Sequence, residues 1–198
     1  MTFPTYDEWV ANVLNPADRA GSGGTYCFET PEWYENYKIK YHIAKAINPK
    51  VIIEVGVRYG YSAHAFLAAC PTARYIGIDA DAAYLNAIPG SGCDWGFAML
   101  RRTIPGFPVL ELIRVNTQEV DVSTMVPWAD LIHIDASHDY HSATKDIETL
   151  WPKCNQAMLV DDYVGTGSVH DAVDLFVKRN GLTMFTATSI NGEALILK

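Results

Sequence analysis

Positive charge is scarce in this chain. Lys and Arg together number 15 against 23 Asp and Glu, which gives a formal net charge of −8. The densest basic run is the pair Arg101-Arg102. Binding to a phosphate backbone depends on clustered positive charge, so we do not expect nucleic acid as a partner.

Long apolar runs and paired cysteines are also missing. No stretch approaches the ~18 apolar residues that span a bilayer, and the first residues have neither the basic nor the apolar region of a signal peptide. The four cysteines are scattered without a Cys-x-x-Cys pair, which argues against a zinc site or a disulfide framework. We therefore expect a cytoplasmic protein with reduced thiols and no membrane partner.

What is present is an ordinary globular composition, 49% hydrophobic and 19% charged, in 198 residues that suit one domain. Short β-branched runs alternate with helical patterns from residue 34 onward. We expect helices at residues 34–47, 62–70, 140–151 and 169–179, and strands at residues 51–55, 75–78, 109–115, 130–134, 157–160, 183–188 and 194–197. This order predicts an α/β fold with a doubly wound, mostly parallel seven-stranded sheet and an antiparallel carboxy-terminal hairpin.

Two segments fall outside this alternation. Residues 1–33 are aromatic but irregular, and residues 87–108 are rich in Gly and Pro. Loops of this length are usually functional, so both segments are candidate lids over a ligand crevice at the carboxyl ends of the strands. Packing over a sheet edge or a homodimer contact explains them equally well. We assign residues 1–33 to an irregular amino-terminal segment or lid and residues 34–198 to the main domain.

The first chemical feature is a strand that ends in Glu54 and enters a turn with Gly56 and Gly60. The next strand ends in Asp79, an acid placed to accept hydrogen bonds from ribose hydroxyls. The turn lacks the Gly-x-Gly-x-x-Gly pattern of dinucleotide sites, and neighbouring tyrosines would crowd a pyrophosphate. S-adenosylmethionine fits better, with its ammonium group attracted by Glu54. A tight turn with solvated acids is the competing interpretation.

The second feature is Asp135-x-x-His138 after one predicted strand and Asp161-Asp162 after the next. Three carboxylates at adjacent strand ends repel one another unless they are protonated or a cation neutralises them. Oxygen ligands suit Mg²⁺ or Ca²⁺, and a histidine one turn away could remove a proton. The competing interpretation makes Asp139 a helix N-cap and the acid pair a solvated strand end. His133, inside its strand, is expected to be a core residue.

These motifs resemble class I S-adenosylmethionine-dependent methyltransferases over about residues 34–198. The segments 53–62 and 75–79 resemble the two cofactor motifs, and Asp135-x-x-His138 with Asp161-Asp162 is similar to the small metal-dependent O-methyltransferases related to macrolide-sugar methyltransferases. Asn116 stands where the family often has an acid after the third strand. The resemblance implies a Rossmann-like methyltransferase fold, His138 as the general base, Mg²⁺ on Asp135, Asp161 and Asp162, and a cofactor site formed by Glu54, Gly56, Gly60, Ser62, Asp79, Asn116 and Asp135.

The expected reaction is methyl transfer from S-adenosylmethionine to a hydroxyl of a small molecule. One alternative is a metal-independent enzyme of the same fold that acts on nitrogen or a carboxylate. Another is a non-catalytic module that only binds S-adenosylmethionine. The aromatic amino terminus suits a phenol or a sugar ring equally, and it is compatible with a homodimer.

Overall fold

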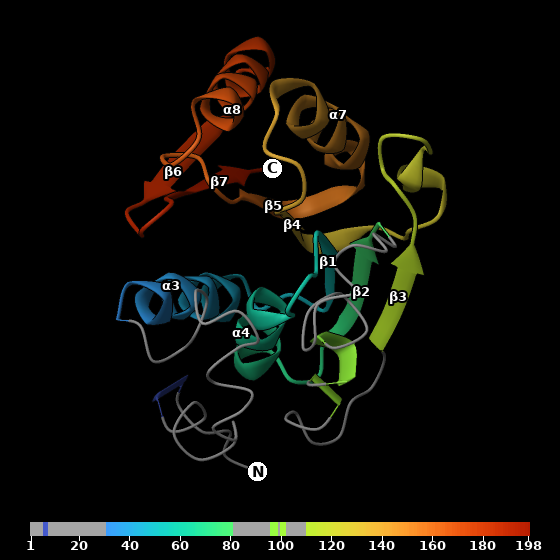
Figure 1. Ribbon diagram of the computed structural model, residues 1–198, viewed down its shortest axis with the longest axis vertical. Helices are drawn as coiled ribbons and strands as arrows, with labels where there is room; N and C mark the ends of the chain where they lie inside the picture. The colour runs from blue at the N-terminus through green and yellow to red at the C-terminus, as the bar shows by residue number, and fades with distance from the viewer. Residues whose placement is uncertain (1–5, 8–30, 81–95, 99, 102–109) are drawn as a thin grey trace.

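A seven-stranded sheet with the strand order β3-β2-β1-β4-β5-β7-β6 runs through the molecule (Figure 1). The structure is a computed structural model that describes residues 6–7, 31–80, 96–98, 100–101 and 110–198. Its strands are β1 (Val51–Val55), β2 (Arg74–Asp79), β3 (Leu110–Arg114), β4 (Ala129–Ile134), β5 (Cys154–Val160), β6 (Thr183–Ala187) and β7 (Glu193–Leu197). Its longer helices are α3 (Pro31–Ile47), α4 (Tyr61–Ala69), α7 (Tyr140–Leu150) and α8 (Gly167–Asn180).

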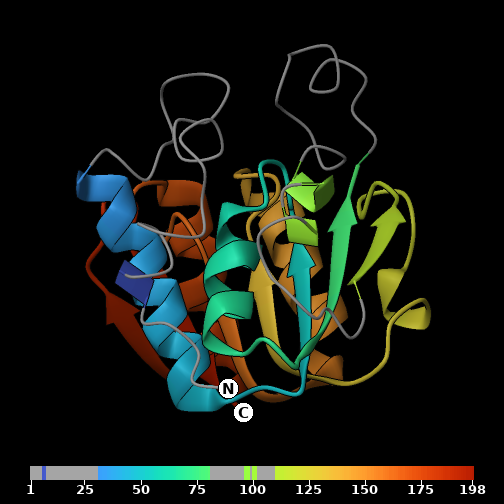
Figure 2. The same ribbon diagram turned by 90° about the horizontal axis from the view of Figure 1, so that it is seen from below.

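The predicted fold is confirmed. Strands β1 to β5 pair in parallel, and β7 pairs antiparallel with both β5 and β6. Figure 2 shows β1, β2 and β3 with their arrowheads pointing the same way. Strand β5 begins three residues earlier than predicted, because the exposed Asn155 and Gln156 conceal its apolar pattern. Helix α3 begins at Pro31 rather than at residue 34, and proline is well suited to a first helical turn.

The two faces of the sheet are covered by different helices. Helices α3 and α4 lie on one face, and α7 and α8 lie on the other (Figure 1). Alternate residues along a strand point to opposite faces. Ile52 and Leu131 therefore belong to the core under α3 and α4, whereas Ile53 and Ile132 belong to the core under α7 and α8. Most of the buried side chains in both cores are apolar, and buried acids gather near the carboxyl ends of β1 and β5.

Both candidate lids lie largely outside the described residues. Of the first segment, Tyr6 is buried and its ring lies 5.5 Å from that of Tyr34 and 5.2 Å from that of Tyr41. Of the second, Phe97 is buried with its ring 6.0 Å from that of Tyr75. The lid roles and the boundary at residue 34 stay predictions. None of the described helices has the length and apolar content that crossing a membrane requires.

Candidate active site

Backbone hydrogen bonds hold three residues at one edge of the sheet, directly after strands β1, β4 and β5. The amide of Gly56 donates to a carbonyl of β2 (2.8 Å), that of Asp135 to a carbonyl of β1 (2.8 Å), and that of Asp161 to a carbonyl of β4 (3.0 Å). Strands β1 and β4 are neighbours, although β2 and β3 separate them in the sequence. The winding direction reverses between them, and the ligand crevice of an open α/β sheet lies at such a point.

The turn between β1 and α4 is built on close backbone approach. Gly56 has a φ of 89°, and a Cβ placed on it would lie 1.8 Å from the carbonyl oxygen of Asp135. Only glycine fits there. Asp79 Oδ2 accepts hydrogen bonds from the amides of Val57 (2.8 Å) and Arg58 (2.9 Å). Burial raises the pKa of Asp79, and these two amide bonds oppose the rise. The acid at the end of β2 therefore fixes the turn at the end of β1.

A polar layer lies beneath this edge, on the side of the sheet that α3 and α4 cover. Glu54 is buried, accepts a hydrogen bond from the hydroxyl of Tyr75, and lies 2.9 Å from Nδ1 of His133. His133 is fully buried, as predicted, with its ring 5.1 Å from that of Phe66. Its Nε2 has no hydrogen-bond partner among the described residues. Glu54 thus joins β1, β2 and β4 from below the crevice.

His138 lies between two of the predicted acids. Its Nε2 is 2.9 Å from Asp162 Oδ2 and 3.7 Å from Asp135 Oδ1. Hydrogen bonds to Asp135 and Asp162 raise the pKa of His138 to about 10, although burial opposes the rise. Burial, followed by the charge of Asp161, raises the pKa of Asp135. The imidazole is therefore protonated at neutral pH in the absence of any other cation.

Backbone conformation and the neighbouring helices position Asp162 and the loop that carries His138. Asp162 has a φ of 58°, a left-handed conformation that costs a residue other than glycine roughly 1–2 kcal/mol. Asp139 caps α7 by accepting hydrogen bonds from the amides of His141 (3.1 Å) and Ser142 (3.0 Å). The hydroxyl of Ser168, in the first turn of α8, donates to the carbonyl of His138 (2.6 Å). The loop that carries His138 is thus attached to both helices of that face.

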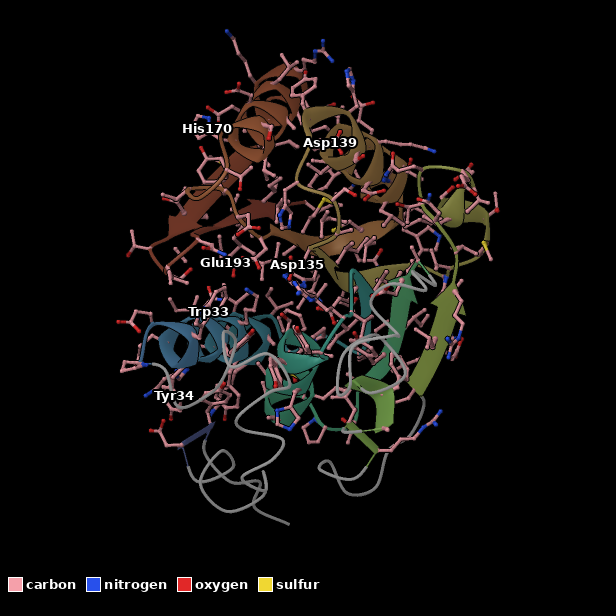
Figure 3. The ribbon with its side chains drawn as sticks, viewed as in Figure 1. Trp33, Tyr34, Asp135, Asp139, His170 and Glu193 are labelled. Carbon is pink, nitrogen blue, oxygen red and sulfur yellow. The ribbon has the colours of Figure 1, made fainter. Side chains whose placement is uncertain are left out.

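Asp161 belongs to a different group, which is buried. Lys40 of α3 is fully buried, and its Nζ lies 3.3 Å from Asp161 Oδ1 and forms an ion pair with Glu193 at the start of β7. Burial alone would raise the pKa of Asp161, but the charges of Lys40 and His133, together with hydrogen bonds, outweigh it and lower the pKa. The pKa of Glu193 is raised by burial and by the charge of Asp161. Figure 3 shows Asp135 and Glu193 between the sheet and α3.

A cavity of about 400 Å³ joins the two ends of the site. It reaches from Asp79 to Asp162, and its volume lies within the roughly 300–1,000 Å³ typical of small-molecule sites. Aromatic rings form part of its wall: those of Tyr59 and Tyr61 are stacked 5.7 Å apart, and those of Trp33 and Tyr37 are 6.2 Å apart. The remaining lining residues are Val55, Gly56, Val57, Arg58, Ser62, Ile78, Ala80, Val115, Asn116, Thr117, Asp135, Ala136, Ser137, His138, Asp161 and Asn191.

The structure brings most of the predicted site residues to this cavity. Glu54 and Gly60 are not among its lining residues. Glu54 lies in the polar layer, and Gly60, with a φ of 74°, is the N-cap of α4. Their contact with a cofactor stays a prediction.

The predicted metal ligands divide between two groups. Among the described residues, ligand atoms come within 4.8 Å of one another in the sets Asp135, His138, Asp162 and His133, Asp135, Asp161. Neither set contains all three predicted acids. The ligand assignment therefore stays a prediction, and Asp135 is the one acid common to both sets.

Several residues of the site were not identified from the sequence. Lys40 is the clearest, and its signal was present: it is three residues from Tyr37 and four from Ala44, on the stripe of α3 that faces the core. Glu193 directly follows the predicted hairpin turn, where an acid is ordinarily solvated. The aromatic wall could not be assigned, because helix periodicity predicts burial without distinguishing a core from a cavity.

Comparisons with known proteins agree with the fold. A family model described as a methyltransferase domain matches residues 53–163, which run from β1 to the turn after β5. No curated protein matches the sequence significantly.

Solved structures share the fold at low sequence identity. Cofactor-bound Rv0187 from MTB has a TM-score of 0.69 and 18% identity, over 100% of this chain and 97% of that chain. The O-methyltransferase from Bacillus cereus, in complex with SAH, has a TM-score of 0.64 and 13% identity, over 99% of this chain and 98% of that chain. The O-methyltransferase TomG from Streptomyces achromogenes is involved in tomaymycin synthesis, and its structure is in complex with SAM. It has a TM-score of 0.62 and 15% identity, over 82% of this chain and 79% of that chain.

Proposed function

Because the chain belongs to this methyltransferase domain family and is an S-adenosylmethionine-dependent methyltransferase, we propose that it methylates a hydroxyl of a small molecule. One observation carries the proposal. A single cavity extends from Asp79, which suits a ribose, to His138 and its two carboxylates, which suit a hydroxyl that must lose a proton. The names of the two O-methyltransferases above support oxygen as the acceptor atom.

The cofactor is proposed to lie over the ends of β1 and β2. A carboxylate has accepting capacity on both oxygens. Asp79 Oδ2 is bonded to the turn, and Oδ1 is the atom that we assign to the ribose. Asn116 lines the same end of the cavity and is assigned to the adenine, whereas Ser62 and Gly56 lie toward the methionine part. Glu54 lies behind the wall, so its attraction for the ammonium group acts through water.

The acceptor is proposed to lie between the aromatic wall and His138. Its oxygen attacks the methyl carbon in line with the methyl–sulfur bond; the new carbon–oxygen bond forms, the old bond breaks, and the sulfide leaves without charge. His138 takes the hydroxyl proton. An imidazole can do so only when it is neutral, and hydrogen bonds to Asp135 and Asp162 raise the pKa of His138 to about 10, so the ring keeps its proton at neutral pH. Activity at neutral pH therefore needs those carboxylates to be neutralised.

The family resemblance implies a divalent cation, and the donor set at this end of the cavity fits one. Asp135 and Asp162 present carboxylate oxygens at one place together with His138, and hard oxygen ligands suit Mg²⁺. Held there, the cation would supply positive charge that favours the deprotonated acceptor. The same charge would lower the affinity of His138 for its own proton. Asp161, the third acid predicted from the sequence, pairs with Lys40 instead.

The proposal leaves a phenol and a sugar hydroxyl as equal candidates for the acceptor. Both ring types can stack on the rings of Trp33, Tyr37, Tyr59 and Tyr61. A panel of phenols and sugars, assayed with methyl-labelled S-adenosylmethionine, would identify the acceptor class by label transfer.

The test of the reaction is substitution of the proposed base. In His138→Gln we expect turnover to fall by about 10²–10⁴, the usual contribution of a general base, while affinity for S-adenosylmethionine is unchanged. His141→Gln, on exposed α7 surface next to the cap, is the matched control and should keep full turnover. Near-normal turnover in His138→Gln would refute this role. Turnover that persists in full after chelation would favour the metal-independent enzyme.

A further inference from the structure

Lys40 is the most unusual residue near the site. A fully buried lysine is rare unless its charge is paired, because an unpaired ammonium loses its hydration without compensation. Here the ammonium is paired twice, with Asp161 of the turn after β5 and with Glu193 of β7. One side chain of α3 therefore connects that helix to two elements of the sheet. Asp161 also lines the cavity, whereas Lys40 and Glu193 are not among its lining residues.

The Lys40 ammonium supplies Asp161 with a positive charge without any bound ion. Its Nζ lies 3.3 Å from Asp161 Oδ1, and both side chains are buried. Burial alone would lower the pKa of Lys40, but the charges of Asp161, Glu193 and Asp135 together outweigh it and raise the pKa.

This ion pair conflicts with a divalent cation on Asp161. Mg²⁺ and Ca²⁺ bind oxygen at about 2.0–2.6 Å, so a cation on Asp161 would lie close to the Lys40 ammonium. Two positive charges would then compete for one buried carboxylate. Asp162 differs, because the group near it is the titratable imidazole of His138 on the open side of the site.

We propose that Lys40 is the resident counter-ion of Asp161, which keeps this carboxylate out of divalent-cation coordination and leaves the cation to Asp135 and Asp162. Lys40 is in this sense a positioning residue: it acts through Asp161, which it holds in the cavity wall. The assignment of the cation to Asp135 and Asp162 rests on the proposed function, whereas the pairing of Lys40 with Asp161 does not.

The test measures Mn²⁺ binding to the cofactor-free protein by calorimetry and by the loss of the free-ion electron paramagnetic resonance signal. Asp162→Asn should weaken Mn²⁺ binding at least about 10-fold, and Asp161→Asn should change it by less than about three-fold. Equal weakening by the two substitutions would overturn the proposal. Asparagine keeps the size of aspartate and tolerates the left-handed conformation of residue 162.

Removing the Lys40 ammonium is a second test of whether this residue keeps divalent cations off Asp161. In Lys40→Met the carboxylate of Asp161 loses its counter-ion, and Mn²⁺ affinity should rise at least about 10-fold, since a carboxylate becomes open to the ion. Lys38→Met, on the same helix and paired with Asp7, is the matched control and should bind as the unmodified protein does. If Lys40→Met does not fold, the comparison of Asp161→Asn with Asp162→Asn decides.

The two proposals fail in distinguishable ways. If the unmodified protein binds no Mn²⁺ but Lys40→Met does, the counter-ion role of Lys40 stands and the cation of the proposed function falls. If neither binds Mn²⁺, Lys40 is not what excludes the ion, and the inference is wrong. S-adenosylmethionine binding, measured on the same samples, reports on the cofactor site separately.

Discussion

At the scale of single residues, the site depends on a few side chains and on the absence of a side chain at Gly56. Gly56 shows this most directly, because any Cβ at that position meets the carbonyl oxygen of Asp135. The glycine was interpreted from the sequence as room for a ligand. In the structure it is also the contact that brings the ends of β1 and β4 together.

Gly56→Ala should therefore destabilise the fold strongly. A positive φ alone costs about 1–3 kcal/mol, and the clash adds to it. Gly167→Ala is the control, since nothing lies within 4 Å of a Cβ at Gly167 in the first turn of α8. The free energy of unfolding from urea titrations should fall for the first variant and be unchanged or slightly higher for the second. Equal unfolding free energies for the two variants would contradict the close approach of Gly56 to the carbonyl oxygen of Asp135.

His138 predicts a pH dependence of stability in the presence of a chelator. Its pKa is about 10 in the folded protein, against an ordinary value near ~6.5 in the unfolded chain. A raised pKa gives stability that is fully present below about pH 6.5 and is lost as the pH rises through about 10. The difference in unfolding free energy between the protein and His138→Gln should therefore shrink over this interval. A difference that stays constant with pH would contradict the ion pairs with Asp135 and Asp162.

At the scale of elements, α8 supports the loop that carries His138, the proposed base, through Ser168. Its hydroxyl bonds the carbonyl of His138, and a net hydrogen bond is worth about 0.5–1.5 kcal/mol. Ser168→Ala should lower turnover several-fold, up to about ten-fold, by loosening the position of His138. Affinity for S-adenosylmethionine should not change, because Ser168 is not among the residues that line the cavity. A fall in cofactor affinity equal to the fall in turnover would show a general disturbance of the fold instead.

Helices and strands could be predicted from the sequence where a single hydrophobic periodicity dominated the segment. Strand β1 was found with its observed bounds, since a β-branched run ends abruptly at Gly56. The start of β5 was missed, because pairing of Cys154 with Ala129 of β4 extends the strand through polar residues. The acids at the strand ends were found because parallel strands bring their carboxyl ends to one edge. Their pairing with Lys40 and His138 depends on side-chain directions, which no local pattern encodes.

At the scale of the whole molecule, the site is distributed over both halves of the sheet. The proposed cofactor end is formed by the tips of β1 and β2, and the proposed acceptor end by the tips of β4 and β5. Lys40 brings α3 and β7 into the same arrangement. Binding of S-adenosylmethionine should therefore stabilise the entire fold, by about 2.7 kcal/mol at 100 times its Kd. A homodimer through the amino-terminal segment stays a prediction, and sedimentation would test it.

The most direct measurement is calorimetric titration of the purified protein with S-adenosylmethionine, compared between Asp79→Ala and Asp130→Ala. Both aspartates accept two backbone amide bonds, but Asp130 does so from Lys50 and Val51 at the opposite end of β1. We expect one cofactor per chain, at least about 10-fold weaker binding in Asp79→Ala from the loss of charge-assisted bonds to the ribose, and unchanged affinity in Asp130→Ala. No binding by the unmodified protein, or equal affinities in the two variants, would contradict the proposed cofactor site.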